Sequence, residues 1–287
     1  MGRLFKSFLF KISKDLTFRI TLIIGVGLAL FLTFVYLMID VATGAFAGET
    51  SHILTGPMML LNTLSPVQNF GLAVPINLIS FICLEFSQGT IRNKIIAGHS
   101  KFKIYTSLFL SGLVFTITLM VVYIGVCTLI GTIVGGFDLS SPVLSGLIGT
   151  TQVDGLFILQ SLLIALFVYV TIVSFTVFFA TLFRVIGPCI PIVLIVLLFL
   201  YFGSTMVTLL EEAFESDVPV TISKILNPLH ALSSGAESEI IFVDGNPTGV
   251  RSYYAVDTFV SALINNAIYT TLFFVGGALI FKKRDVK

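Results

Sequence analysis

The stretch that decides the fold is residues 156–183, LFILQSLLIALFVYVTIVSFTVFFATLF, which contains no Asp, Glu, Lys or Arg. A helix needs about 20 apolar residues to cross roughly 30 Å of hydrocarbon, and it satisfies its own backbone hydrogen bonds there. The whole chain is 56% hydrophobic and only 11% charged, whereas a soluble domain is about 25% charged. We therefore predict an integral membrane protein. This composition excludes a soluble enzyme, a disordered chain and a nucleic-acid-binding protein.

Six stretches reach the length of a membrane-spanning helix. None shows the ten-residue alternation of an outer-membrane barrel strand, so we predict an all-α helical bundle in a single transmembrane domain, residues 1–287. The second span is the least regular, because it contains Gln68, Asn69 and Pro75. The run before it, Met58–Leu61, could be a short helix at the membrane interface. The predicted spans are residues 20–39, 65–84, 104–134, 156–183, 185–210 and 258–281.

The basic residues are unevenly distributed, and cytoplasmic loops beside membrane spans collect Lys and Arg. The segment before the first span carries five, the loop between the second and third spans four, the link after the fourth span one and the tail four. Of the 16 Lys and Arg residues, 14 thus lie on one side. The other side keeps Lys224 and Arg251 with 12 of the 15 acidic residues, a split hidden by the formal net charge of +1. We predict that both termini are cytoplasmic.

The first 19 residues form an amphipathic segment. At 100° per residue its apolar side chains fall on one face, while three lysines point away. We predict a helix lying on the inner leaflet, residues 1–19, with its lysines facing anionic lipid headgroups. A short basic flank that only orients the first span is the alternative. The apolar face consists of Phe5, Phe8, Leu9, Ile12 and Leu16.

Two loops are long enough to have structure of their own. The cytoplasmic loop, residues 85–103, reads EFSQGTIRNKIIAGHSKFK, in which Gly89 and Gly98 bracket a short helical stretch with apolar and basic side chains. The external segment, residues 211–257, begins acidic, continues through TISKILNPLHALSSG and ends in a turn-rich DGNP. Its apolar middle is too short to span. We expect a re-entrant or interfacial helix there.

Motifs for ATP binding, metal binding and hydrolysis are absent from the sequence. No G-x-x-x-x-G-K-[ST] phosphate loop occurs, so any ATP must be hydrolysed by a partner. His52, His99 and His230 each lack a second His or Cys at ligand spacing, so we predict no metal site and no cofactor in this chain. The three cysteines lie inside apolar runs and are expected to be small buried hydrophobes.

The span interiors hold almost no ionisable side chain, which disfavours an ion-coupled transporter. Glu85 is expected at a cytoplasmic helix end, where water or headgroups reach it. Glycines of two spans suit close helix packing: Gly125, Gly131, Gly135 and Gly136 of the third, and Gly276 and Gly277 of the sixth. Uncharged polar residues in or near the spans are expected to form helix-to-helix hydrogen bonds; they are Asn69, Asn77, Gln160, Asn265 and Asn266.

Several motifs together resemble one family. They are the run GTIRNKIIAGHSKFKIYTS at 89–107, the link FATLFRVIGP at 179–188, an external NPLHAL at 227–232 and a loose E-x-x-x-G-T pattern formed by Glu85, Gly89 and Thr90. With six spans and an amphipathic first helix, the chain resembles bacterial ABC transporter permeases of the type-2 exporter class that lack their own ATPase domain.

The resemblance implies roles for three segments. Residues 89–101 would form a coupling helix that docks on a cytoplasmic ABC ATPase, which would hold ATP and magnesium. Residues 1–19 would be the connecting helix, and Asn227, Pro228, Leu229 and His230 would belong to an external gate. Two permease chains, the same or homologous, would join two ATPase chains. The residues assigned to docking are Glu85, Gly89, Thr90, Ile91, Arg92, Lys94, Ile95, Ile96 and Lys101.

The expected function is therefore that of a permease subunit, not an enzyme, in the bacterial cytoplasmic membrane. It would export a hydrophobic or amphipathic substrate, such as an antimicrobial or toxin peptide or a drug. Two alternatives remain open. A secondary transporter or channel would work without ATP, and a sensor or scaffold would form a stable complex without any transport.

Overall fold

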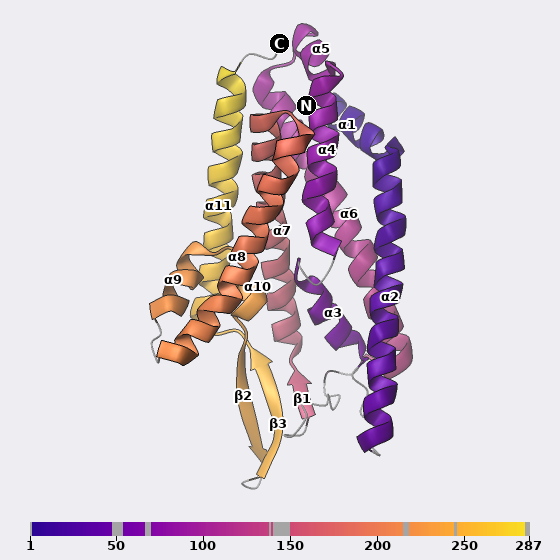
Figure 1. The fold of residues 1–287 in the computed structure, drawn as a ribbon, viewed down its shortest axis with the longest axis vertical. Coiled ribbons are helices and arrows are strands. Elements are labelled where there is room, and N and C mark those ends of the chain that lie inside the picture. Colours follow the sequence, from indigo (N-terminus) through magenta and orange to yellow (C-terminus); the bar gives the residue numbers. More distant parts are fainter. Residues whose placement is uncertain are drawn as a thin grey trace.

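The computed structural model of the chain describes residues 2–47, 54–66, 70–137, 139, 150–214, 218–243 and 246–284. Within that part, five helices are long and apolar enough to cross a membrane. They run along the long axis of the molecule (Figure 1). The chain is thus a multi-pass helical membrane protein. The five helices are α2 (Leu16–Ala47), α6 (Lys101–Gly135), α7 (Gly155–Phe183), α8 (Ile186–Phe214) and α11 (Val256–Lys283).

Helix α7 is the most buried of the five and packs against α11, α6 and α8. Its sequence is apolar all round, which is typical of a helix surrounded by other helices. It begins after Asp154 and ends before Arg184, whose left-handed φ of 60° terminates the helix. The predicted spans 20–39, 104–134, 156–183, 185–210 and 258–281 correspond, within a residue, to parts of α2, α6, α7, α8 and α11.

The second predicted span, residues 65–84, is not one helix. The chain forms α3 (Gly56–Leu64), the short η1 (Phe70–Leu72) and α4 (Ala73–Ser87), and residues 67–69 lie outside the described part. At 1.5 Å per residue α4 is only about 22 Å long, which is short for a span. Helix α5 (Thr90–Ile96) follows α4 at an angle of 57°. Figure 1 shows α3 and α4 one beyond the other alongside α6.

The short helix considered for Met58–Leu61 is confirmed as part of α3, which packs against α6 and α7. Leu54, Met59 and Leu64 have almost no exposed surface. The contact with α6 is close because α6 presents glycines. A Cβ added at Gly131 would lie 2.8 Å from Cγ of Met59, closer than real Cβ atoms approach. The close packing predicted for Gly131 and Gly135 is thus confirmed, and their neighbours are residues 54–59, which lead into α3. The prediction is also confirmed for Gly277, which meets Tyr105, but it is wrong for Gly125 and Gly136, where an added Cβ would meet nothing within 4 Å.

The N-terminal helix is shorter than predicted. Helix α1 (Gly2–Lys14) ends before Asp15, whose carboxylate accepts a hydrogen bond from the backbone N–H of Thr17 (3.2 Å) at the start of α2. Phe8 and Ile12 are buried against the bundle, and α1 packs on α6. Leu16, predicted on the same face, belongs to α2 and is 68% exposed. The apolar stripe of α1 therefore covers protein, where we predicted lipid.

A small β-sheet, which the sequence did not predict, accompanies the helices. It lies at the end of the molecule opposite the termini (Figure 1). Strand order is β1–β3–β2, with β1 parallel and β2 antiparallel to β3. Two of these strands lie in the segment 211–257, predicted to be external, which also contains α9 and α10. The bounds are β1 (Thr150–Val153), β2 (Glu237–Val243), β3 (Asn246–Tyr253), α9 (Val218–Leu226) and α10 (His230–Ser234).

Candidate functional site

A buried carboxylate joins three helices near the end that carries both termini. Glu85, in the last turn of α4, has no exposed surface. Its Oε2 lies 3.2 Å from Nζ of Lys94 in α5, and its Oε1 forms an ion pair with Nζ of Lys11 in α1. Lys11 Nζ also donates to Oε1 of Gln88 (3.1 Å). The expectation that water or headgroups reach Glu85 is wrong, because its side chain is fully buried and paired with two lysines.

Lys94 is held in place from two directions. Besides Glu85, its ammonium lies 3.2 Å from the centroid of the Phe8 ring, and the Phe8 ring meets that of Phe81 edge-on. A cation over an aromatic face is attracted by the ring quadrupole. The α1 stripe, the end of α4 and the middle of α5 thus form one packed unit, which we call the α1–α4–α5 junction (Leu4, Phe8, Lys11, Ile12, Phe81, Glu85, Ile91 and Lys94).

Helix α5 exposes only part of the face predicted for docking. Ile91 is fully buried, whereas Arg92 is exposed and Ile96 is 73% exposed. The seven-residue helix starts after Gly89, whose φ of 67° is left-handed, so the chain can reverse sharply after α4. Ile91 and Lys94 therefore face the bundle. The prediction that both belong to an exposed docking face is wrong. Arg92 and Ile96 remain on its outer surface, with Ile95 half-buried.

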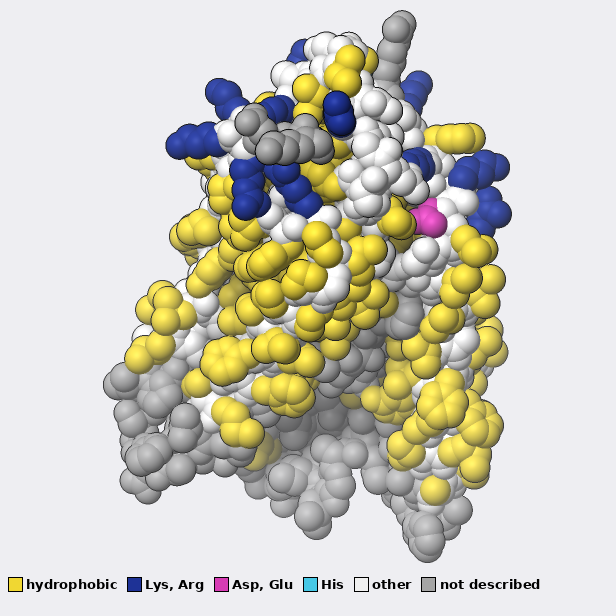
Figure 2. Space-filling view, turned by 45° about the horizontal axis from the view of Figure 1, so that its top comes forward, with side chains coloured by type: hydrophobic (Ala, Val, Ile, Leu, Met, Phe, Trp, Pro, Cys, Tyr) yellow, Lys and Arg dark blue, Asp and Glu magenta, His cyan; other side chains and the backbone are white. Residues whose placement is uncertain are grey.

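The end of the molecule with α5 is strongly basic. Figure 2 shows Lys and Arg side chains gathered around it. Lys101, assigned to docking, is engaged at the surface by the chain itself: its Nζ donates to the backbone carbonyls of Lys282 (3.2 Å) and Arg284 (2.8 Å) at the end of α11. A lysine often binds the last carbonyls of a helix in this way. The start of α6 is thereby fixed to the end of α11.

The predicted gate residues are buried where α9 leads into α10. Asn227, Pro228 and Leu229 form the α9–α10 link, and His230 begins α10. The side-chain amide of Asn227 donates to the carbonyl of Leu200 in α8, and its Oδ1 accepts from the backbone N–H of Leu229 (3.0 Å). The carbonyl of Pro228 accepts from Nδ2 of Asn266 in α11 (3.0 Å). The NPLH segment is therefore fixed to two long helices at once.

Polar residues of α11 hold the same segment. Asn265 donates to the carbonyl of Lys224 (3.0 Å), and the Tyr269 hydroxyl donates to the carbonyl of Leu226 (2.7 Å). Oδ1 of Asn266 accepts from the Thr171 hydroxyl in α7 (2.9 Å). The predicted helix-to-helix bond is confirmed for Asn266. The sequence did not predict that these side chains would also bind backbone carbonyls of the external segment.

His230 is part of this buried segment, with 2% of its surface exposed. Its Nδ1 lies 3.0 Å from the hydroxyl of Ser223. Burial, with a further effect from Lys224, lowers the pKa of His230 to about 4. The imidazole is therefore neutral at neutral pH. Within the described ranges, no three His, Cys, Asp or Glu residues come close enough to hold a metal ion.

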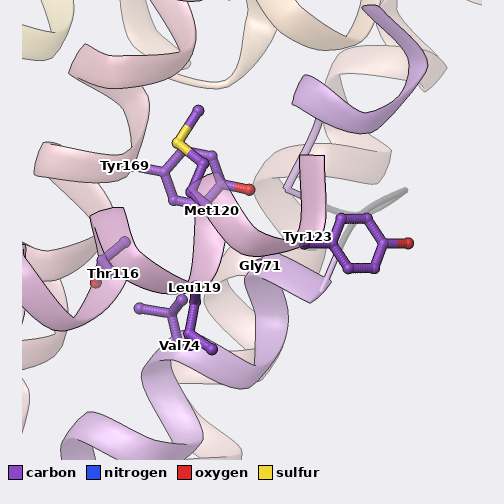
Figure 3. A pocket seen from close by; sticks show the side chains of 7 residues that line it. All are labelled: Gly71, Val74, Thr116, Leu119, Met120, Tyr123 and Tyr169. Carbon is purple, nitrogen blue, oxygen red and sulfur yellow. The ribbon is translucent and has the colours of Figure 1, made fainter. Parts of the chain in front are cut away.

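Among the cavities between the described helices, two differ widely in size. The first, at the junction of η1 and α4, has a volume of about 10 Å³, enough for a single water. Figure 3 shows Met120 and Tyr169 beside it, above Leu119 and Val74. The second, of about 190 Å³, lies among α7, α8 and α11 and touches the α9–α10 link. The three cysteines are free and buried, as predicted.

The fold and the site define a class of multi-pass helical membrane protein. One end is basic and carries a short helix fixed by a buried ion-pair cluster. A buried polar segment lies toward the other end. A family model described as "Protein of unknown function (DUF2705)" matches residues 28–287, so the chain belongs to that family. No curated protein and no solved structure matches the chain.

Proposed function

We propose that the chain is the transmembrane permease subunit of an ATP-binding cassette exporter whose ATPase is a separate protein. The observation that carries the proposal is α5: a short helix that presents Arg92 and Ile96 at the basic end while Ile91 and Lys94 fix it to the bundle. A helix exposed on one face and fixed on the other suits the transfer of force from a partner.

The junction supports mechanical coupling between α5 and the long helices. A partner that pushes α5 displaces Lys94, and the buried carboxylate of Glu85 transmits this displacement to α4. Lys11 extends the link to α1, which packs on α6. Since a buried charge is costly to separate from its partners, the three helices would move as one body. Such a rigid-body movement could alternate the bundle between inward and outward openings.

The α9–α10 link suits the role of an external gate in this mechanism. It is held by side-chain amides of Asn227, Asn265 and Asn266, each of which binds a backbone carbonyl. A relative shift of α8 and α11 would break these hydrogen bonds together. In the proposed arrangement the sixth span is completed by α3 and α4, and both termini with α5 face the cytoplasm, in agreement with the basic split.

The remaining features of the proposal follow from the same class. The working unit contains two permease chains and two ATPase chains, which bind ATP and magnesium. The substrate is hydrophobic or amphipathic, and export of an antimicrobial or toxin peptide or of a drug from the bacterial cytoplasmic membrane is the narrower form. The large apolar cavity beside the gate supports a hydrophobic cargo.

Reconstitution tests the proposal. The chain is purified gently from its native membrane, and bound proteins are identified by mass spectrometry. We expect a protein with a phosphate loop in stoichiometric amount, and ATP-dependent transport of a hydrophobic peptide or drug by the complex in vesicles. Transport driven by an ion gradient without ATP would instead indicate a secondary transporter, and a stable complex without ATPase or transport would indicate a scaffold.

A further inference from the structure

The cavity among α7, α8 and α11 has the properties of a binding site for hydrocarbon. Its volume of about 190 Å³ exceeds that of a cavity known to bind benzene, about 150 Å³. The wall is formed by α7, α8, α11 and the α9–α10 link. It includes Ile172 and Phe175 of α7, Leu197 and Leu200 of α8, Phe273 of α11 and Leu229 of the link. The cavity is partly open, so a ligand can enter it without unfolding the bundle.

The lining favours a hydrocarbon over a polar ligand. Among the described residues that line it, none is charged, and the two that carry hydroxyl groups are already engaged. The Thr171 hydroxyl lies 2.9 Å from Oδ1 of Asn266, and the Tyr269 hydroxyl donates to the carbonyl of Leu226 (2.7 Å). A buried polar ligand would therefore lose its hydrogen bonds to water and find no replacement, which costs a few kcal/mol per group.

The position of the cavity indicates which molecule supplies the hydrocarbon. It lies between membrane-spanning helices, where acyl chains are the abundant solvent. We propose that this cavity binds the terminal part of the hydrocarbon chain of a membrane amphiphile, with roughly seven carbons inside, scaled from the benzene cavity. Contacts with Pro228 and Leu229 place the chain end against the α9–α10 link. That the amphiphile is also the exported substrate rests on the proposed function.

Photolabelling tests the site directly. The full chain in lipid nanodiscs is irradiated with a palmitic acid analogue that carries a diazirine near the end of its chain, and labelled peptides are mapped by mass spectrometry. A phosphatidylglycerol with the same labelled chain distinguishes a bilayer lipid from a single-chain amphiphile. We expect saturable labelling of α7, α8 and the α9–α10 link, reduced about tenfold by excess unmodified palmitic acid, the effect of about 1.4 kcal/mol of competing binding.

Two variants of α8 form a matched pair. Leu197→Trp fills the cavity, because Leu197 lines it and is only 5% exposed. Ile195→Trp places the same side chain on the outer surface of α8, where Ile195 is 65% exposed. We expect labelling to be lost in L197W and retained in I195W. Since the natural chain contains no Trp, the emission of each introduced indole also reports whether it is buried as intended.

A third variant keeps the test decisive if L197W misfolds. Phe273→Ala enlarges the cavity and should retain or increase saturable labelling. Equal labelling of all exposed helix faces, unaffected by competitor or by L197W, would overturn the site. That result with ATPase capture intact would leave the permease proposal standing. Saturable labelling without capture of an ATPase would support the hydrocarbon site and contradict the permease proposal.

Discussion

The ammonium of Lys94 and the carboxylate of Glu85 lie 3.2 Å apart although a left-handed glycine and a bend of 57° separate their helices. Glu85 is fully buried, and Lys11 completes its neutralisation from α1. This cluster decides which side of α5 faces the protein. The surface that α5 leaves for a partner is therefore small, and it includes the exposed side chains of Arg92 and Ile96.

Removing the charge of Glu85 should destabilise the protein. Glu85→Gln leaves the half-buried Lys94 without its carboxylate; breaking a fully buried pair costs about 3–5 kcal/mol, which is the upper bound here. We expect a clear fall in the thermal midpoint in detergent. The double variant E85Q/K94M should recover part of it. Asp257→Asn is the matched control, since the pair of Asp257 with Lys224 is exposed and long (4.0 Å) and should be worth under about 1 kcal/mol.

Charge reversal at Arg92 should uncouple the partner without affecting the fold. Arg92 is exposed, so Arg92→Glu should change the free energy of unfolding by less than about 0.5 kcal/mol. Transport by the reconstituted complex should fall at least about tenfold, because 1.4 kcal/mol of lost docking energy has that effect. Arg251→Glu, exposed at the opposite end, is the control for transport only, because it also breaks the ion pair of Arg251 with Asp154 and is expected to lower stability slightly. Normal transport in R92E would exclude Arg92 from docking.

The glycines of α6 should differ sharply in their tolerance of alanine. Gly131→Ala drives a methyl group into Met59 and the carbonyl of Thr55, and such overpacking costs about 1–3 kcal/mol. Gly125→Ala on the same helix meets nothing within 4 Å and should be neutral or slightly stabilising. Thermal unfolding of both variants measures the difference. Equal midpoints would contradict the close packing of α3 on α6.

Acid should destabilise the α9–α10 link through His230. The pKa of His230 is lowered from 6.5 to about 4 by burial, so between these pH values the unfolded segment binds more protons than the folded one. The free energy of unfolding should therefore fall by up to about 1.4 kcal/mol per pH unit as the pH drops below 6.5. Hydrogen exchange of residues 223–231 should rise in that range. His230→Gln should remove this pH dependence, and His99→Gln should leave it unchanged.

Much of the helical architecture could be predicted, because spans such as 156–183 contain no charged residue and end where charges appear. The interruption of the second predicted span between α3 and α4 could not be predicted. It depends on the packing of α3 against Gly131 and Gly135, which lie more than sixty positions away in the sequence. The sheet was missed because β1 is four residues long and pairs with a strand far along the chain.

The candidate site was predicted in outline but not in orientation. The loop 85–103 was identified from its glycines and mixed composition. Its seven-residue helix is too short for periodicity to show that Ile91 faces inward. Glu85 was expected in water, because nothing in the local sequence indicates that Lys11, far away in α1, reaches it. Contacts of this kind arise only in the folded bundle.

Cross-linking from α5 tests the central claim most directly. The natural cysteines are all buried, so Ile96→Cys provides the accessible thiol at the tip of α5, and Val256→Cys, 76% exposed at the start of α11, provides a matched control. A reagent with a maleimide at one end, which alkylates the introduced thiol, and a diazirine at the other, which on irradiation loses nitrogen and inserts into a nearby bond of the partner, is applied to native membranes, and the products are identified by mass spectrometry. We predict that I96C cross-links to a phosphate-loop ATPase and that V256C does not. If both variants gave no ATPase, or gave it equally, α5 would not be the docking helix.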